Sequence, residues 1–319
     1  MSFGKIEKFI ISNELIKPHM TIILGLSGGP DSVYLLHFLR WLQKKISFNL
    51  VAAHLDHEWR KSSKEDALFC ETLCKNLNIP LESSTISQLN ISFKKSGSKE
   101  DIARQCRRFF FEEIRKKYDA NAIALAHNQD DQLETFFIRL MRGATVTGLA
   151  CMRIKQGYYI RPLLSVSKKE ILAYLARKKF EYVIDPTNIN TAFLRNRIRL
   201  ELLPLLQKVD QRAETNMLKT INAMQETDDF LKKLALTTLE EICTEKEGKK
   251  YLTIKQFLSN DPFLQRRVLL EWLYQNHVSF TISTALIDEI IRFLNNKKST
   301  THQFDNWQIK KHKGLAHIL

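Results

Sequence analysis

Residues 21–32 read Thr-Ile-Ile-Leu-Gly-Leu-Ser-Gly-Gly-Pro-Asp-Ser, a run from which the local fold of the first part of the chain can be predicted. An apolar, β-branched run ends in a glycine-rich turn, and leucines at helical spacing follow at once. Pro30 suits the first position of a helix, because that position needs no N–H donor and the ring already fixes φ. The segment therefore predicts a strand, a tight turn and the N-terminus of a helix.

A turn of this kind forms a cradle for an anion, because free backbone N–H groups and the positive end of the helix dipole point at one spot. Gly28 and Gly29 let the backbone approach a phosphate without an intervening Cβ, and Ser27 and Ser32 add hydroxyl donors. Asp31 is unusual in an anion site unless a cation bridges it to the phosphate, and Mg²⁺ is the usual bridge. The alternative is a glycine turn that precedes a helix by chance.

The loop differs from the two best-known phosphate loops, since it has neither Gly-Lys-Ser/Thr after the turn nor GxGxxG. The string Ser27-Gly28-Gly29-Pro30-Asp31-Ser32 instead resembles the pyrophosphate loop of the N-type ATP pyrophosphatases. Those enzymes cleave ATP to AMP and pyrophosphate while they adenylate a substrate oxygen. The resemblance implies that ATP binds at 27–32.

Composition narrows the class of protein. The chain has 319 residues, 44% of them hydrophobic, which favours about two domains with real cores. We expect a cytoplasmic protein without membrane attachment, because no apolar run reaches the ~18–20 residues of a membrane span and no secretory signal is visible. The 5 cysteines are an odd number and form no CxxC pair, so buried thiols are expected rather than disulfides or a metal cluster.

The formal net charge of +14 favours a polyanionic partner. Nucleic acid is the first candidate. An anionic membrane surface is a weaker one, because no basic amphipathic helix stands alone at a terminus. Lysines that are merely solvated are the remaining alternative.

Strand-like and helical patterns alternate through the first two thirds of the chain, which predicts an α/β fold with an open, mainly parallel sheet covered on both faces. The expected strands are 22–26, 50–54, 81–85 and 122–127, and the expected helices are 32–44, 64–78, 100–118 and 130–142. Ser167 and Glu170 predict the capping box of a further helix, and a turn is expected at 185–188. We place a domain boundary between 208 and 209. The smaller C-terminal domain is expected to be mainly helical, with short strands in the tail 303–319.

Polar residues should gather where parallel strands end, because ligands bind beyond the carboxyl ends of such strands. The first strand ends at Ser27. The second ends at His54-Leu55-Asp56-His57, with Arg60 just beyond, and a later one at His127-Asn128-Gln129-Asp130-Asp131. Three strand ends therefore deliver groups suited to phosphate, metal or proton chemistry.

Asp130, Asp131 and Glu134 share one face at the start of a helix. They could hold Mg²⁺, accept a proton or bind an amino group, although acids in a first turn are also ordinary partners of the helix dipole. Together with His54, His57 and His127 they could suggest zinc, but their spacing matches no common zinc motif.

Two arginine groups are candidates for phosphate contacts. Arg104 and Arg108 lie one turn apart on an expected helix and could clamp a phosphate. Arg195, Arg197 and Arg199 lie near the domain junction, where they could meet a nucleic-acid backbone or form ion pairs between domains.

In their order along the chain, these motifs resemble the tRNA(Ile)-lysidine synthetases, in particular the short members of that family. The resemblance covers about two thirds of the chain and runs through the following segments: 27–32, 54–60, 100–108, 126–135, 161–164 and 185–199. Two positions depart from the family pattern, since Asn128 stands where a second histidine is usual and 143–145 replaces a Gly-Ser-Gly-like turn.

The resemblance implies a PP-loop catalytic domain at 1–208 and a tRNA-recognition domain at 209–319. It implies that ATP adenylates the C2 carbonyl oxygen of the wobble cytidine in tRNA(Ile) with a CAU anticodon, and that the side-chain amine of free L-lysine then displaces AMP. We hypothesise that Asp31 and Asp131 hold Mg²⁺, that Glu134 binds or deprotonates lysine, and that His127 assists catalysis. His54 and Asp56 would line the nucleotide pocket, and Arg104 would contact phosphate. A homodimer is left open.

Three alternatives remain. A tRNA thiolase could use the same loop, although no reactive cysteine pair is visible. A non-catalytic RNA-binding protein could keep ATP only as a structural ligand. A synthetase acting on a small molecule, such as GMP synthetase, fits the loop but not the charge.

Overall fold

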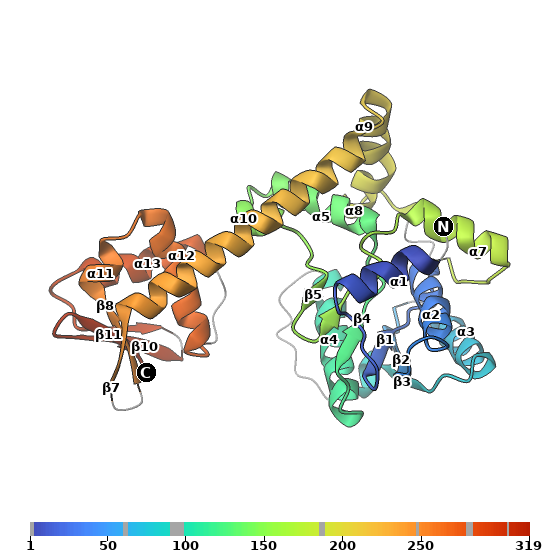
Figure 1. Ribbon diagram of the computed structural model, residues 1–319, viewed down its shortest axis with the longest axis horizontal. Helices are drawn as coiled ribbons and strands as arrows, with labels where there is room; N and C mark the ends of the chain where they lie inside the picture. Colours follow the sequence, from blue (N-terminus) through green and yellow to red (C-terminus); the bar gives the residue numbers. More distant parts are fainter. Residues whose placement is uncertain are drawn as a thin grey trace. The chain divides into compact units, whose positions relative to one another are not determined.

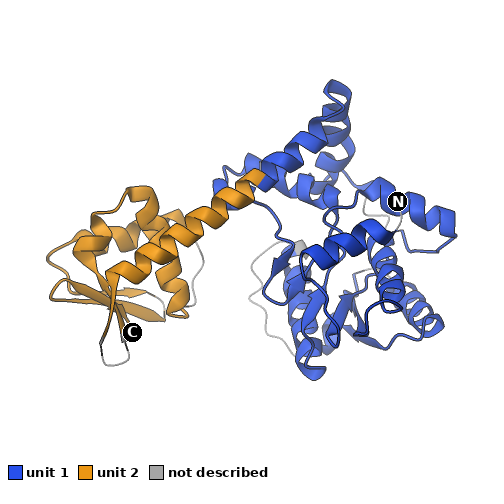
Figure 2. Ribbon diagram, viewed as in Figure 1, with its two compact units in different colours: residues 1–222 blue, residues 223–319 orange. Residues whose placement is uncertain are grey.

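The computed structural model describes residues 3–59, 63–89, 99–184, 189–246, 249–278, 283–304 and 306–319. The chain forms two compact units, Met1–Asn222 and Ala223–Leu319 (Figure 2). This division falls inside helix α10 (Ala213–Ile242), whereas the boundary predicted between 208 and 209 precedes that helix. The predicted turn at 185–188 and Arg60 lie outside the described residues.

The first unit contains the predicted α/β sheet (Figure 1), with strand order β3-β2-β1-β4-β6-β5. The first four strands along the chain are parallel to their neighbours, as expected, and β6 continues the parallel order. Only the edge strand β5 is antiparallel among the described strands of this sheet. The strands are β1 (Thr21–Gly25), β2 (Asn49–Asp56), β3 (Leu81–Thr85), β4 (Ala122–Ala124), β5 (Lys155–Gln156) and β6 (Tyr159–Ile160).

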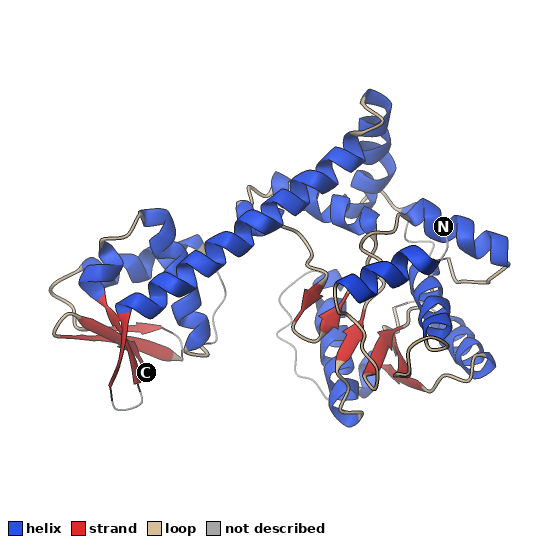
Figure 3. Ribbon diagram, viewed as in Figure 1, coloured by secondary structure: helices blue, strands red, loops and turns tan. Residues whose placement is uncertain are grey.

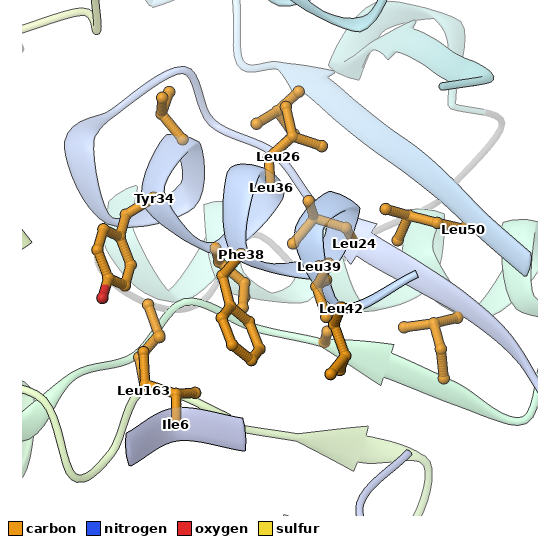
Figure 4. Packing of buried hydrophobic residues seen from close by; sticks show 14 of the residues in the cluster. Ile6, Leu24, Leu26, Tyr34, Leu36, Phe38, Leu39, Leu42, Leu50 and Leu163 are labelled. Carbon is orange, nitrogen blue, oxygen red and sulfur yellow. The ribbon is translucent and has the colours of Figure 1, made fainter. Parts of the chain in front are cut away.

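Alternate residues of β1, β2, β4 and β6 belong to two separate cores, which confirms that both faces of the sheet are covered. Ile22 and Leu24 of β1 pack with helices α1, α2, α3 and α7, while Ile23 faces α4. Figure 4 shows the first core, with Leu39 of α2 beside Leu24 and Leu36 beside Leu26. The helices are α1 (Phe3–Ser12), α2 (Pro30–Leu42), α3 (Ser63–Asn76), α4 (Lys99–Lys117) and α7 (Lys168–Lys178).

Helix α1 is not among the elements expected from the sequence. Its buried residues are Phe3, Ile6 and Ile10, a spacing that places all three on one face of a helix. Phe3 packs edge-on against Tyr34 and Phe38 of α2. The helical spacing of apolar residues covers only a short segment here. We infer that α1 is stabilised mainly by this contact with α2.

A third group of elements in the first unit surrounds α5 (Gln129–Met141). Leu133 and Phe136 of α5 pack against Ile198, Leu203 and Ile221. The contributing elements are α8 (Leu194–Arg197), the π-helical turn η3 (Ile198–Leu202), α9 (Leu203–Val209) and the first part of α10; the short helices α6 (Val146–Leu149) and η1 (Ile86–Gln88) complete the unit. This packing holds the basic segment that includes Arg195 and Arg199 against α5.

The second unit is mainly helical, as predicted, and also contains an antiparallel sheet of order β7-β8-β11-β10-β9 (Figure 3). The tail strands β9, β10 and β11 were expected, whereas the hairpin of β7 and β8 was not. Asp261 caps α12 by accepting the N–H of Phe263 at 2.8 Å. The elements are β7 (Cys243–Lys246), β8 (Lys249–Thr253), α11 (Ile254–Leu258), α12 (Pro262–Gln275), α13 (Thr284–Asn295), β9 (Thr301–Phe304), β10 (Trp307–His312) and β11 (Leu315–Ile318).

The five cysteines are free thiols. Four of them are buried, as predicted from the sequence, and Cys243 is half-buried. Burial raises the pKa of Cys70 to about 12, so this thiol is neutral near pH 7. Among the described residues, we find no helix whose length and apolar character would let it span a bilayer.

Candidate nucleotide and substrate site

The loop between β1 and α2 has the predicted strand–turn–helix form. Gly28 has a φ of +79°, and a Cβ there would lie 3.3 Å from the Cys70 sulfur, so both conformation and space call for glycine. Gly29 is the N-cap of α2 and Pro30 follows at the start of the helix. The Ser32 hydroxyl accepts the Ser27 N–H at 3.1 Å and donates to the Gly29 carbonyl at 3.0 Å, which closes the loop.

The open end of this loop offers donors to an anion. Within the described part of the chain, the N–H groups of Asp31 and Ser32 donate to no acceptor. Both belong to the first turn of α2, where the helix leaves such groups unpaired. The loop therefore has the geometry of a phosphate cradle.

Asp31, at the start of α2, is joined to the end of β4 by Asn128. The Asn128 amide donates to Asp31 Oδ1 at 3.0 Å, and its own backbone N–H donates to Asp131 Oδ2 at 2.9 Å. Asn128 Oδ1 in turn accepts the Asp131 N–H at 3.1 Å and so caps α5. Asn128 is 3% exposed. The residue that departs from the family pattern thus holds the two predicted magnesium ligands together.

A second, unpredicted residue reaches Asp31. The Lys168 ammonium lies 2.6 Å from Asp31 Oδ2, and both side chains are about one-third exposed, at 32% and 28%. The backbone N–H of Lys168 donates to Asp130 Oδ2 at 2.7 Å. The capping box of Ser167 and Glu170 starts α7 at this point, as predicted. The sequence signal for Lys168 was its position directly after that N-cap, at the start of a helix.

The donor set around Asp31 fits Mg²⁺. Carboxylate oxygens are its preferred protein ligands, and Mg²⁺ commonly takes only one or two of them together with substrate phosphates and water. Asp31 and Asp131 supply two carboxylates beside the phosphate cradle. No cluster of three or more His, Cys, Asp and Glu side chains suited to a metal occurs among the residues that the structure describes.

Glu134 of α5 lies between two of the arginines proposed to bind RNA. Arg195 Nε is 2.8 Å from one carboxylate oxygen and Arg199 Nε is 2.6 Å from the other. Glu134 is fully buried, whereas the two arginine side chains are 39% and 36% exposed. Burial raises the pKa of Glu134, although the arginines oppose the rise. The third arginine, Arg197, is exposed.

His54 and Asp56 lie at the end of β2 and are both buried. His54 Nδ1 lies 2.9 Å from the Leu26 carbonyl, which can only accept, so we assign the proton to Nδ1. That leaves Nε2 as a buried acceptor without a partner in the described residues. Asp56 accepts the Glu58 N–H at 2.7 Å and the Ser63 hydroxyl at 3.0 Å. Asp56 thus shapes the loop after β2.

His127, at the end of β4, is neutral near pH 7. Burial lowers its pKa to about 4, although Asp131 opposes the shift, and its Nδ1 is buried without a partner in the described residues. The charges of Arg161, Arg195 and Arg104 act in the same direction as burial. His127 therefore stands between the acidic groups of α5 and a set of arginines.

Arg104 and Arg108 are exposed on α4, with the Arg108 guanidinium 5.5 Å from the centre of the Tyr159 ring. Arg161, just after β6, is a buried arginine near Arg104 and Arg108. It was not among the candidate site residues derived from the sequence. Its position within Arg-Pro-Leu-Leu at a strand end was the available signal.

A cradle for phosphate at the first strand of an open parallel sheet, with carboxylates at the neighbouring strand end, defines a class of nucleotide-binding protein. The chain belongs to the PP-loop domain family, whose model matches residues 3–206. It is similar to a tRNA(Ile)-lysidine synthase of Bacillus cereus, at 37% identity over 298 residues, covering 91% of this chain and 63% of the relative.

A second relative has the same name. The tRNA(Ile)-lysidine synthase of Bacillus subtilis (strain 168) is 35% identical over 300 residues, covering 91% of this chain and 63% of that protein. The chain thus spans less than two thirds of the length of the curated relatives it matches. Among solved structures, the U34-tRNA thiolase NcsA from Methanococcus maripaludis, with its 4Fe–4S cluster, shares the fold. Its TM-score is 0.59 at 16% identity, covering 70% of this chain and 79% of that one.

Proposed function

We propose that this chain ligates L-lysine to carbon 2 of the wobble cytidine of tRNA(Ile) with a CAU anticodon. ATP and L-lysine are consumed, and lysidine, AMP and pyrophosphate are formed. The observation that carries the proposal is the similarity to tRNA(Ile)-lysidine synthases over 91% of the chain. The phosphate cradle at 27–32 and the carboxylates beside it supply chemistry that suits this reaction.

In the first step, the C2 carbonyl oxygen of the cytidine attacks the α-phosphorus of ATP. A P–O bond forms there, the bond to the β-phosphate breaks, and pyrophosphate leaves. The N–H groups of Asp31 and Ser32 and the start of α2 would stabilise the leaving charge. Membership of the PP-loop family supports the use of ATP. We infer that the free Nε2 of His54 accepts a hydrogen bond from the nucleotide.

Asp31 and Asp131 would hold Mg²⁺ against the phosphates. The ion would supply charge stabilisation for the departing pyrophosphate. For Asp31 to take this role, the Lys168 ammonium must leave Oδ2, and it can then follow the negative charge onto the phosphates. Asn128 would keep both carboxylates in place during the exchange.

In the second step, the lysine ε-amine attacks C2, the C–O bond breaks, and AMP leaves with the bonding electrons. An ε-ammonium has an ordinary pKa near 10.4, so removing its proton at pH 7 costs about 4–5 kcal/mol. Asp131 and neutral His127 are available to accept a hydrogen bond from the amine. That Glu134 binds or deprotonates lysine stays a prediction. In this role, the lysine amine would have to compete for the Glu134 carboxylate with two guanidinium groups.

The basic charge and Arg197 support tRNA as the partner, since Arg197 is the exposed member of its arginine group. We propose that 1–208 performs the chemistry and that 209–319 contributes to tRNA recognition. A cytoplasmic location and a homodimer also remain predictions.

The direct test is incubation of the chain with ATP, labelled L-lysine and transcribed tRNA(Ile) with a CAU anticodon. We expect label in the RNA and one AMP released per lysine incorporated. Methionine tRNA with the same anticodon is the control. Sulfur transfer to tRNA without lysine would favour a thiolase, and tight tRNA binding without AMP release would favour a non-catalytic RNA-binding protein.

A further inference from the structure

Among the described residues, Arg161 is a buried cation without an anionic partner. The residue is 7% exposed. One guanidinium nitrogen donates to the Arg153 carbonyl at 2.8 Å, while Nε is buried and has no partner in the described residues. Within the described part of the chain, no carboxylate forms an ion pair with Arg161. A buried charge in this state is costly unless an opposite charge approaches it.

The topology brings two more guanidinium groups to the same place. Side chains alternate along a strand, so Arg161 shares the α4 face with Tyr159, while Ile160 faces the other core. Arg108 of α4 lies over the Tyr159 ring, at 5.5 Å. Going from Tyr159 to Arg161 advances about 6–7 Å toward the carboxyl edge of the sheet.

Helix α4 precedes β4 in a parallel crossover and so runs antiparallel to the strands. Going from Arg108 back to Arg104 therefore moves about 6 Å toward the same edge. Arg104 is thus placed over Arg161, as Arg108 is placed over Tyr159. The electrostatics agree, because burial lowers the pKa of Arg161 and the charges of Arg104 and Arg108 lower it further.

This arginine group, Arg104, Arg108 and Arg161, is separate from the phosphate cradle. The cradle follows β1, and β6 is two strands away in the sheet order, or roughly 10 Å. β4, the strand that precedes His127 along the chain, lies between β1 and β6 in the sheet. An anion on Arg161 is therefore a different group from the one that contacts the N–H groups of α2.

We propose that Arg161, assisted by Arg104 and Arg108, binds an oxyanion of a small-molecule substrate. A planar guanidinium matches a carboxylate or phosphoryl group with two parallel hydrogen bonds. Because Arg161 is buried, a small ligand is favoured over the backbone of an RNA. In terms of the proposed function, on which this identification of the ligand rests, the oxyanion is the α-carboxylate of L-lysine or a terminal phosphate of ATP.

The test measures binding of three ligands by calorimetry: ATP, L-lysine in the presence of a non-cleavable ATP analogue, and cadaverine, which is lysine without its carboxylate. The variant is Arg161→Met, which keeps much of the volume of the stem without the charge. The matched control is Arg142→Met, an exposed arginine at the end of α5. Arg161→Lys tests whether a point charge can replace the guanidinium fork.

If the carboxylate is the ligand, Arg161→Met weakens lysine binding about ten- to a hundredfold and leaves cadaverine and ATP unchanged. If a phosphate is the ligand, ATP affinity falls and lysine affinity does not. Either result supports the inference and identifies which substrate, L-lysine or ATP, carries the oxyanion bound by Arg161. Unchanged affinity for all three ligands in a folded Arg161→Met protein would overturn it.

Exposed Arg104 provides a second variant in case Arg161→Met does not fold. Arg104→Gln is expected to weaken the same ligand several-fold, and no effect of Arg104→Gln would then count against the inference. The proposed function is judged separately, by label in tRNA with the wild-type chain. A wild type that makes no lysidine but binds ATP through Arg161 would refute the function and keep the oxyanion site, whereas a wild type that binds none of the ligands would refute both.

Discussion

Lys168 and Asp31 form an ion pair of 2.6 Å that connects the start of α7 to the start of α2. Asp31 is the acidic residue of the phosphate cradle, and Asn128 donates to its other oxygen at 3.0 Å. Both oxygens of Asp31 are therefore engaged before any nucleotide arrives. A cation in the site must compete with the Lys168 ammonium.

Replacing Lys168 by Met should make Asp31 easier for a divalent cation to bind. We expect Mn²⁺, as a probe for Mg²⁺, to bind the nucleotide-free protein about three- to tenfold more tightly, the range typical of a partly exposed ion pair. Electron paramagnetic resonance titration measures the free Mn²⁺. Lys169→Met is the control, and equal Mn²⁺ affinity in all three proteins would show that Lys168 does not compete at Asp31.

Arg199 and Arg197 lie two residues apart and should behave differently. Arg199→Met leaves Glu134 buried with one arginine, and we expect the free energy of unfolding to fall by about 2 kcal/mol, less than for a fully buried pair because Arg199 is partly exposed. Arg197→Met should change stability by less than ~0.5 kcal/mol. Urea denaturation measures both.

The same two variants distinguish a structural role of an arginine from a role in RNA binding. If Arg197 contacts the tRNA backbone, Arg197→Met weakens tRNA binding and lowers its salt dependence without loss of stability. Equal stability losses in the two variants would contradict the assignment of Arg199 to the Glu134 ion pair.

Gly28 and Gly29 are adjacent but have different requirements. Gly28→Ala places a Cβ at a φ of +79° and 3.3 Å from Cys70, so we expect a loss of about 1–2 kcal/mol in unfolding free energy. Gly29 has an ordinary φ of −70°, and Gly29→Ala should fold normally. Thermal denaturation compares them. ATP binding should fall in Gly28→Ala because the loop must shift away from Cys70, and in Gly29→Ala because a side chain is added at the N-cap of α2, beside Ser27. Full ATP affinity in Gly29→Ala would place the phosphate elsewhere.

His37 should make stability depend on pH. Its ring stacks on Phe180 at 3.6 Å, and burial lowers its pKa from 6.5 to about 4. Between these values the unfolded chain binds more protons than the folded one, so the free energy of unfolding falls as the pH falls from 6.5 to 4. His57 and His127 shift in the same direction and add to the loss.

We expect His37→Gln to reduce that loss by about 1–3 kcal/mol over the window. Urea titrations at several pH values between 6.5 and 4 measure it. The control is His312→Gln, at an exposed position. A pH dependence identical to that of the wild type in His37→Gln would show that this ring does not titrate with unfolding.

Regular patterns in the sequence predicted the elements well where the signal was local. The glycine turn, Pro30 and the alternating apolar runs predicted β1, α2 and the parallel sheet. Ser167 and Glu170 predicted the start of α7 through its capping box. Helix α1 and the hairpin of β7 and β8 were missed, because short segments of this kind are stabilised mainly by the surfaces on which they pack.

The loop 27–32, the sheet that carries it and the carboxylates at the strand ends could be predicted from the amino-acid sequence. These depend on residues close together in the chain, where propensity and spacing act directly. The charge pairs among the described residues depend instead on the folded arrangement: Lys168 pairs with Asp31, Arg195 and Arg199 pair with Glu134, and Arg161 pairs with no acid. Such pairings join residues that are far apart along the chain, and Coulomb interaction depends on distance in space, which a linear pattern does not contain.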